Sequence, residues 1–143
     1  PRRRPLVLAA AAAACIAVGV GGGVLLATPA APPDGPAGAL GAVEAVSFDG
    51  EPEGVAVDGD VVAHTWGTEA VLTIDGLPTG AAYDVVMLDG SGNEWSAGTF
   101  LGSDITIDCR MNASVLREDA VEVQIRAEDG TEIATAALPS VAG

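Results

Sequence analysis

The sequence predicts an all-β fold, an immunoglobulin-like antiparallel β-sandwich, preceded by a single transmembrane α-helix. Two observations support this prediction. Residues 6–27 form one uninterrupted apolar segment, whereas residues 43–138 consist of short runs of alternating apolar and polar residues, separated by Gly, Asp, Asn and Pro. Roughly seven or eight such runs at a spacing of about ten residues are typical of a sandwich of immunoglobulin size.

The chain of 143 residues divides into four predicted parts. About 115 residues follow the apolar segment, which suits one domain with a linker rather than two domains. We expect a cytoplasmic basic flank at 1–5, a transmembrane helix at 6–27, a Pro/Ala/Gly-rich stalk at 28–41 and an extracytoplasmic β-sandwich at 42–143.

The apolar segment has the length and the flanking charges of a membrane span. At about 1.5 Å per helical residue it covers roughly 33 Å, enough for a hydrocarbon core of about 30 Å. Arg2, Arg3 and Arg4 precede it, and the next cationic residue is Arg110. The positive-inside rule therefore predicts a single-pass protein of the cell membrane, with its N-terminus in the cytoplasm and its C-terminal domain outside.

Other interpretations of this segment stay open beside the anchor. A secretory signal peptide has a shorter apolar region of about 7–15 residues, although cleavage near residues 28–30 is conceivable. A lipoprotein would use Cys15, yet further apolar residues follow Cys15 where a polar linker is usual. Gly19 and Gly23 form a G-x-x-x-G pair that suits helix association, but glycine is common throughout this span.

Charge and composition exclude several function classes. The formal net charge is −14, and in the predicted external part only Arg110, Arg117 and Arg126 offset the carboxylates. Such a surface repels phosphate backbones, so we exclude nucleic-acid binding. Cys15 lies in the span and Cys109 outside it, so the two do not pair, and Cys109 is predicted to be a small buried residue. With one histidine in the chain, we expect no metal site and no cofactor.

The stalk and the strands follow one another along the chain. Residues 28–41 are rich in Pro, Ala and Gly and lack the large apolar side chains that a folded core needs, so they predict a semi-extended stalk. The strands that follow are predicted from their alternation and from the turn residues between them. The predicted strands are 61–66, 68–75, 82–88, 94–100, 105–109, 121–127 and 131–138, and the segments 43–48 and 54–58 are weaker strand candidates.

The segments between these strands predict the reversals. Residues 76–80, G-L-P-T-G, suit a tight reversal because Pro and Gly favour turn conformations. Residues 89–93, D-G-S-G-N, predict a hairpin turn, and residues 128–130 predict another. Residues 112–119 are the one place with helical character, because Asn112 suits a helix N-cap; we expect a single turn or a short helix there.

The large aromatic side chains are predicted to anchor the core, because rings bury large apolar areas. Gly67 is predicted to allow a bulge or a close crossing of strands. The predicted aromatic anchors are Phe48, Trp66, Tyr83, Trp95 and Phe100.

Three short motifs follow one another in the sandwich region: H-T-W-G-T-E, then G-L-P-x-G-x-x-Y, then A-G-T-F. In this order, and after a single span, they resemble the extracytoplasmic domain of actinobacterial membrane-anchored anti-sigma factors. The resemblance covers roughly residues 61–139. The motif residues are His64, Trp66, Gly67, Thr68, Glu69, Gly76, Leu77, Pro78, Gly80, Tyr83, Gly98 and Phe100.

The resemblance implies a non-enzymatic signalling protein. Such proteins carry a cytoplasmic N-terminal domain, often zinc-binding through one His and two Cys, that sequesters an extracytoplasmic-function sigma factor. The sigma factor is released by proteolysis outside and then within the membrane. No residue of this chain matches the zinc motif and the chain opens with Pro1, so we expect the sigma-binding domain to precede Pro1 in a parent protein. The implied partners are the lipid bilayer, the sigma factor through the missing cytoplasmic domain, a site-1-type protease and an intramembrane protease.

The competing interpretation is a membrane-anchored or secreted cell-surface binding module with no transcriptional role. A structural stalk protein of the envelope is a third. The sequence H-x-x-x-C-x-x-C upstream of Pro1 would identify the anti-sigma parent, whereas a start codon directly before Pro1 would favour the binding module.

The sequence offers few candidates for chemistry. His64 is the one residue able to act as the base of a Ser-His-Asp triad, and no G-x-S-x-G elbow accompanies it, so we predict a hydrogen-bonded structural histidine and no enzyme. Asp89, Ser91 and Asn93 match the first half of a calcium loop, but its required Gly and Glu are absent. A hairpin turn is the favoured interpretation there, and weak binding of divalent ions at the acidic turns stays open beside it. Asn112 begins a glycosylation sequon, which nothing in the composition supports.

Overall fold

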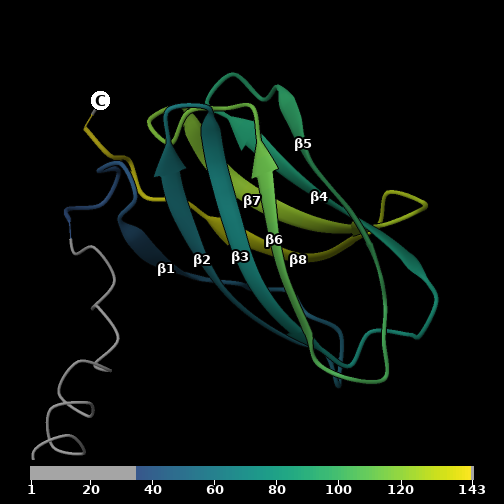
Figure 1. The fold of residues 1–143 in the computed structure, drawn as a ribbon. Helices are drawn as coiled ribbons and strands as arrows, with labels where there is room; N and C mark the ends of the chain where they lie inside the picture. Colours follow the sequence, from purple (N-terminus) through teal and green to yellow (C-terminus); the bar gives the residue numbers. More distant parts are fainter. Residues whose placement is uncertain (1–34, 143) are drawn as a thin grey trace, which may run out of the picture. The chain divides into compact units, whose positions relative to one another are not determined.

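The computed structural model describes residues 35–142, which form a sandwich of two antiparallel sheets (Figure 1). One sheet has the order β1-β2-β3-β6 and the other the order β5-β4-β7-β8. The predicted all-β class with two antiparallel sheets is therefore confirmed. The strands are β1 (Val43–Ser47), β2 (Ala56–His64), β3 (Gly67–Asp75), β4 (Ala82–Asp89), β5 (Glu94–Leu101), β6 (Ile107–Ala113), β7 (Ala120–Ala127) and β8 (Glu132–Ala137).

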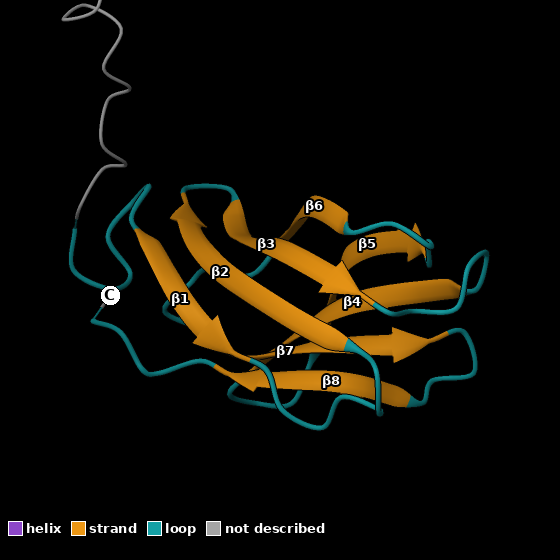
Figure 2. Ribbon diagram, turned by 90° about the horizontal axis from the view of Figure 1, so that it is seen from below, coloured by secondary structure: helices purple, strands orange, loops and turns teal. Residues whose placement is uncertain are grey.

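Figure 2 shows strands and loops throughout this part of the chain. Across residues 35–142 there is no helix of the length and apolarity needed to span a bilayer. The basic flank at 1–5, the predicted span at 6–27 and residues 28–34 of the predicted stalk lie outside the described residues.

The core lies between the two sheets and follows from alternation along the strands. In β3, Leu72 and Ile74 are almost fully buried while Thr73 between them is exposed. Met87 of β4 and Ile125 of β7 contribute buried side chains from the opposite sheet. Because a strand directs successive side chains to opposite faces, this period of two gives each sheet one apolar face. Burial of each such side chain contributes about 1.5–3 kcal/mol.

The connections give the sandwich two distinct ends. The connections β1–β2, β2–β3, β4–β5 and β7–β8 join antiparallel neighbours within a sheet, whereas the connections β3–β4, β5–β6 and β6–β7 cross between the sheets. We call the end nearest residue 35 the proximal end and the other the distal end. The proximal end consists of the N-terminal arm (residues 35–42), the turns at 65–66 and 90–93, the loop 114–119 and the tail 138–142. The distal end consists of the loops 48–55, 76–81, 102–106 and 128–131.

The strand boundaries differ from the prediction in two places. The two short strands predicted at 54–58 and 61–66 are one continuous strand, β2, which runs straight through Asp58-Gly59-Asp60. Gly59 does not turn the chain there. A Cβ at Gly59 would lie 2.8 Å from the ring of Phe48, so the glycine makes room for a core side chain. The strand predicted at 105–109 is β6 at Ile107–Ala113.

Two predicted local structures differ in part from the expectation. Of the single turn or short helix expected at 112–119, the single turn is present: the amides of Asp119 and Ala120 donate to the carbonyl of Leu116. Asn112 belongs to β6 and caps no helix. Long-range contacts of this loop, described below, override its helical propensity. The reversal predicted at 76–80 is present, with the amide of Ala81 donating to the carbonyl of Pro78 at 3.3 Å, and it carries the chain from β3 in one sheet to β4 in the other.

The prediction of aromatic core anchors is half right. Phe48 and Tyr83 are buried, and the Tyr83 ring stacks on Phe100 with a centroid distance of 5.5 Å. Trp66, by contrast, is 67 % exposed, and Trp95 is 37 % exposed. Trp66 occupies the turn between β2 and β3, from which a side chain cannot reach between the sheets. Apart from Phe48 and Tyr83, the core is filled by aliphatic side chains and Met87.

Candidate functional site

The proximal end is held together by a buried ion pair. Arg117, in the loop 114–119, is 3 % exposed. Its Nε and Nη2 donate to the two carboxylate oxygens of Glu44 on β1, at 2.9 and 2.8 Å. Nη2 also donates to the carbonyl of Pro139 at 2.8 Å, and Nη1 to that of Ala120 at 3.3 Å. The bidentate geometry matches the planar guanidinium to the carboxylate and makes this a strong, directional contact.

The same carboxylate holds the N-terminal arm. The backbone amide of Gly38 donates to Glu44 at 3.1 Å, and Gly41 donates to the carbonyl of Ala63 on β2 at 2.8 Å. Gly38 also lies against Val141 of the tail. The described end of the predicted stalk therefore lies on the sandwich. We call the contacts of Arg117 and Glu44 with the arm, the loop and the tail the proximal clamp.

The first motif lies beside the clamp. His64 Nε2 is 2.8 Å from Glu69 Oε2, and Arg110 Nη1 is 3.5 Å from the other oxygen of Glu69. The ring of Trp66 stacks on His64 with a centroid distance of 4.5 Å and an interplanar angle of 7°. Glu69 thus hydrogen-bonds with His64, as predicted for the histidine, and forms an ion pair with Arg110. This arrangement orders the turn and leaves the outer face of Trp66 in solvent.

Gly67 and Thr68 join this hairpin to β6 and to the loop 114–119. Thr68 is fully buried, and its hydroxyl donates to the carbonyl of Val115 at 2.8 Å. Gly67 has a φ of 143°, and a Cβ there would lie 2.0 Å from the carbonyl oxygen of Ala113. The close crossing of strands at Gly67 is therefore present.

The second and third motifs lie elsewhere. Leu77, within the β3–β4 connection, is buried, and the amide of Gly80 donates to the carbonyl of Gly102 at 2.9 Å. The motif residues therefore divide between the two ends and do not converge on one site. Those at the distal end are Gly76, Leu77, Pro78, Gly80, Tyr83 and Phe100, and Gly98 faces Val85 in the middle of β5.

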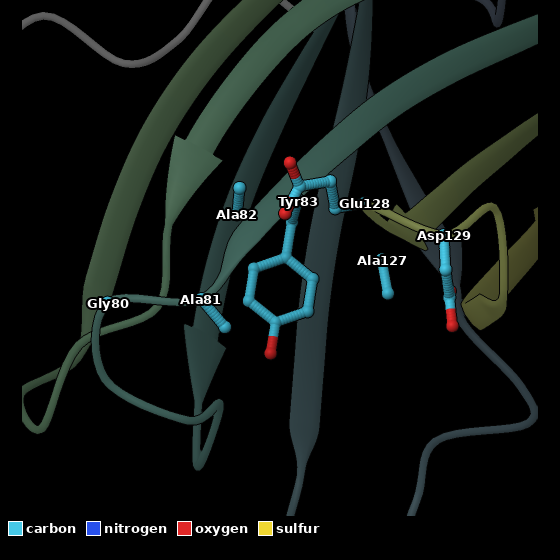
Figure 3. Close-up of a pocket in the computed structure, with 7 residues that line it drawn as sticks. All are labelled: Gly80, Ala81, Ala82, Tyr83, Ala127, Glu128 and Asp129. Carbon is cyan, nitrogen blue, oxygen red and sulfur yellow. The ribbon is translucent and has the colours of Figure 1, made fainter.

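Surface cavities occur at both ends. At the distal end, a cavity of about 500 Å³ has Tyr83 at its centre, with Ala81 and Ala82 on one side and Ala127 and Asp129 on the other (Figure 3). It presents mainly methyl groups and carboxylates.

Two cavities at the proximal end share Leu116 and Glu118. One, of about 530 Å³, is bounded by Asp89 and Trp95; the other, of about 490 Å³, is bounded by Leu40. Both cavities combine apolar side chains with acidic ones.

The turn between β4 and β5 is organised by Asp89. Its carboxylate accepts from the amides of Ser91 and Asn93, from the side-chain amide of Asn93 and from the indole N–H of Trp95. These donors, the Asn93 side chain first, lower the pKa of Asp89 from 3.8 to about 2. The carboxylate oxygens are taken up by turn contacts, and the predicted hairpin turn is confirmed.

Acidification below pH 4 is expected to loosen this turn. The folded pKa of Asp89 is about 2 and lies below the unfolded value of 3.8. The stabilisation is therefore present above pH 3.8 and is lost as the pH falls toward 2. The NMR chemical shift of the Asp89 carboxyl carbon should titrate near pH 2. The protection of the Ser91 and Asn93 amides from hydrogen exchange should fall over the same pH range. In D89N that protection should show no such step; a native midpoint near 4 would contradict the assignment.

Metal binding and thiol chemistry find no support in residues 35–142. Within that range no three His, Cys, Asp or Glu side chains are grouped closely enough to hold a metal ion. Cys109 is half-buried rather than fully buried, and burial, with a smaller contribution from Asp108, raises the pKa of its thiol. A protonated thiol is a poor nucleophile and a poor ligand.

Sequence reasoning missed the proximal clamp. In the sequence, Glu44 cannot be told from the acidic residues on the exposed face of a strand. Arg117 was considered only as one of the three arginines of the predicted external part. One signal was present, because Arg117 follows Val115-Leu116 in a chain with very few cations. Its partners are distant in sequence and could not be read from it.

No protein-family model, curated protein or solved structure matches the chain.

Proposed function

We propose that this chain is the transmembrane and extracytoplasmic sensor part of an anti-sigma factor. In the parent protein, a cytoplasmic domain would hold an extracytoplasmic-function sigma factor inactive and so repress its transcription. The chain would control release of that factor by regulated proteolysis. Its own role would be mechanical and regulatory: it anchors the parent in the membrane and governs protease access to the segment between membrane and sandwich.

The order of features along the chain supports this proposal. A basic flank, an apolar segment long enough to span, a Pro-rich segment and a small all-β domain with the three motifs follow one another. The observation that carries the proposal is the proximal clamp. Through Gly38 and Glu44, it fastens the arm that continues into the Pro-rich segment to the loop and tail of the sandwich. A change in the sandwich can thereby reach the chain leading to the membrane.

We also propose the finer class of the fold, an immunoglobulin-like sandwich. With β1 set aside as an added edge strand, β2, β3 and β6 take the places of strands A, B and E. Strands β5, β4, β7 and β8 take those of C′, C, F and G. In such sandwiches the loops at the ends commonly carry recognition, which agrees with a sensing role for either end.

The direct test is recovery of the partner. The native full-length protein, tagged at its C-terminus, is purified from membranes and its bound proteins are identified by mass. We expect a sigma factor to be recovered, and to be lost when everything before Pro1 is deleted. Recovery of envelope components alone, with the tag on a processed form that lacks the apolar segment, would overturn the proposal in favour of a secreted or surface binding module.

A further inference from the structure

Exposed large hydrophobic side chains gather at the proximal end. Of those that the structure records in residues 35–142, only Leu101 and Ile105 lie toward the distal end. The proximal ones are Leu40 (66 % exposed), Val43 (49 %), Trp66 (67 %), Trp95 (37 %), Leu116 (40 %) and Val121 (42 %). A small acidic domain gains nothing from such a concentration unless something covers it, because large exposed apolar patches mark interaction sites.

Most of these side chains lie around two cavities that share Leu116. Leu40 and Leu116 line the same cavity, which also includes His64, the residue on which Trp66 stacks. Leu116 in turn lines the neighbouring cavity with Trp95 and Val121. We call the surface formed by Leu40, Trp66, Trp95, Leu116 and Val121 the proximal apolar face. It runs across the turn 65–66, the arm, the loop 114–119 and the starts of β5 and β7.

The length of the chain outside the described residues indicates what covers this face. Residues 28–34 separate the predicted span from the proximal end, and seven residues reach at most roughly 25 Å when fully extended. The distal end lies farther away by the length of β3, nine residues or about 30 Å. If residues 6–27 span the bilayer, as the proposed function requires, the proximal end is thus the end held next to the lipid.

We propose that the proximal apolar face docks on the interfacial layer of the bilayer that anchors the chain. Trp66 is suited to that layer, because an indole has a large apolar surface and a polar N–H, and leucines beside it enter the acyl boundary. Exposed carboxylates of Glu118 and Asp119 lie within the same loop as Leu116. They keep the contact shallow and make it weaker on anionic than on zwitterionic lipid.

The chain contains two tryptophans, both on this face, so intrinsic fluorescence reports on the contact. The whole chain is reconstituted in phosphatidylcholine vesicles whose acyl chains are brominated near the ester end. We expect bromine to quench tryptophan emission, W66F to remove most of that quenching, and anionic lipid to reduce it. Unquenched emission, or equal quenching of Trp66 in anionic vesicles, would overturn the proposal.

A matched control places the probe at the other end. Ile105 is 74 % exposed and precedes β6 at the distal end. In a chain carrying W66F, W95F and I105W, we expect emission to be insensitive to bromolipid; quenching there would mean that the sandwich lies on the membrane without a preferred end, against the proposal. Resistance of the chain to alkaline carbonate extraction tests the anchor separately. A chain that carbonate extracts from the vesicles would contradict the proposed membrane anchor. A chain that resists extraction but shows no quenching would contradict only the docking of the proximal apolar face.

Discussion

Replacing Glu44 by glutamine is expected to lower the free energy of unfolding of the sandwich by about 3–5 kcal/mol. The substitution keeps the shape of the side chain but removes the charge that compensates Arg117, whose side chain is 2 % exposed. Loss of one partner of a buried pair leaves the other charge desolvated. Urea unfolding of the whole chain, followed by tryptophan emission, measures the effect. A domain of this size has about 5–15 kcal/mol to lose.

The chain provides a matched control in Glu94. This residue also forms an ion pair, with Arg126 Nη2 at 2.7 Å, and Arg126 lowers the pKa of Glu94. The side chain of Glu94 is, however, 55 % exposed, and exposed pairs are screened by water. E94Q should leave the unfolding midpoint nearly unchanged. If E44Q and E94Q lowered the free energy of unfolding equally, the buried ion pair of the proximal clamp would contribute no more to stability than the exposed pair.

The clamp variant also bears on the proposed function. Because the amide of Gly38 donates to Glu44, E44Q should release the N-terminal arm in addition to destabilising the sandwich. Without denaturant, and at a temperature well below the unfolding transition, a non-specific protease should cut residues 35–44 faster in E44Q than in the native chain. E94Q should match the native chain. If E44Q were destabilised but its arm were cleaved at the native rate, the proximal clamp would stabilise the sandwich without controlling protease access to the arm.

Replacing Gly76 by alanine is expected to destabilise the sandwich by about 2–5 kcal/mol. Gly76 has a φ of +84°, and a Cβ there would lie 1.9 Å from the carbonyl oxygen of Gly54. A left-handed conformation costs an alanine about 1–2 kcal/mol, and the clash with backbone adds a further cost, because the loops 48–55 and 76–81 must separate. Thermal or urea unfolding of the whole chain measures the sum.

Gly80, four residues later in the same motif, separates the two costs. Its φ of +80° is almost that of Gly76, but nothing lies within 4 Å of where its Cβ would be. G80A should therefore lose only the conformational part, about 1–2 kcal/mol. The difference between the two variants measures the close approach of the loops. If G80A were as destabilising as G76A, backbone strain alone would account for both.

Features that depend on interactions between residues close in sequence were predicted correctly, whereas features that depend on distant residues were not. The strands at 68–75, 82–88 and 121–127 were found almost to the residue, because a buried apolar face on one side imposes a period of two that is visible locally. The break predicted at Asp58-Gly59-Asp60 is absent, because Gly59 makes room for the ring of Phe48, which lies eleven residues away in the sequence. The helical character of 112–119 is limited to a single turn, because Arg117 and Val115 bond to groups that are distant in the chain.

By itself, the sequence determined the all-β class, the number and order of most strands, the hairpin turn at Asp89 and the acidic character of the domain. Each of these depends on composition, on periodicity or on neighbours a few residues apart. The tertiary structure alone decided that Glu44 meets Arg117, that Trp66 faces solvent, and that the exposed hydrophobic side chains collect at one end. These outcomes depend on which strands become neighbours, and residues 73 positions apart are brought together only when the two sheets close on a common core.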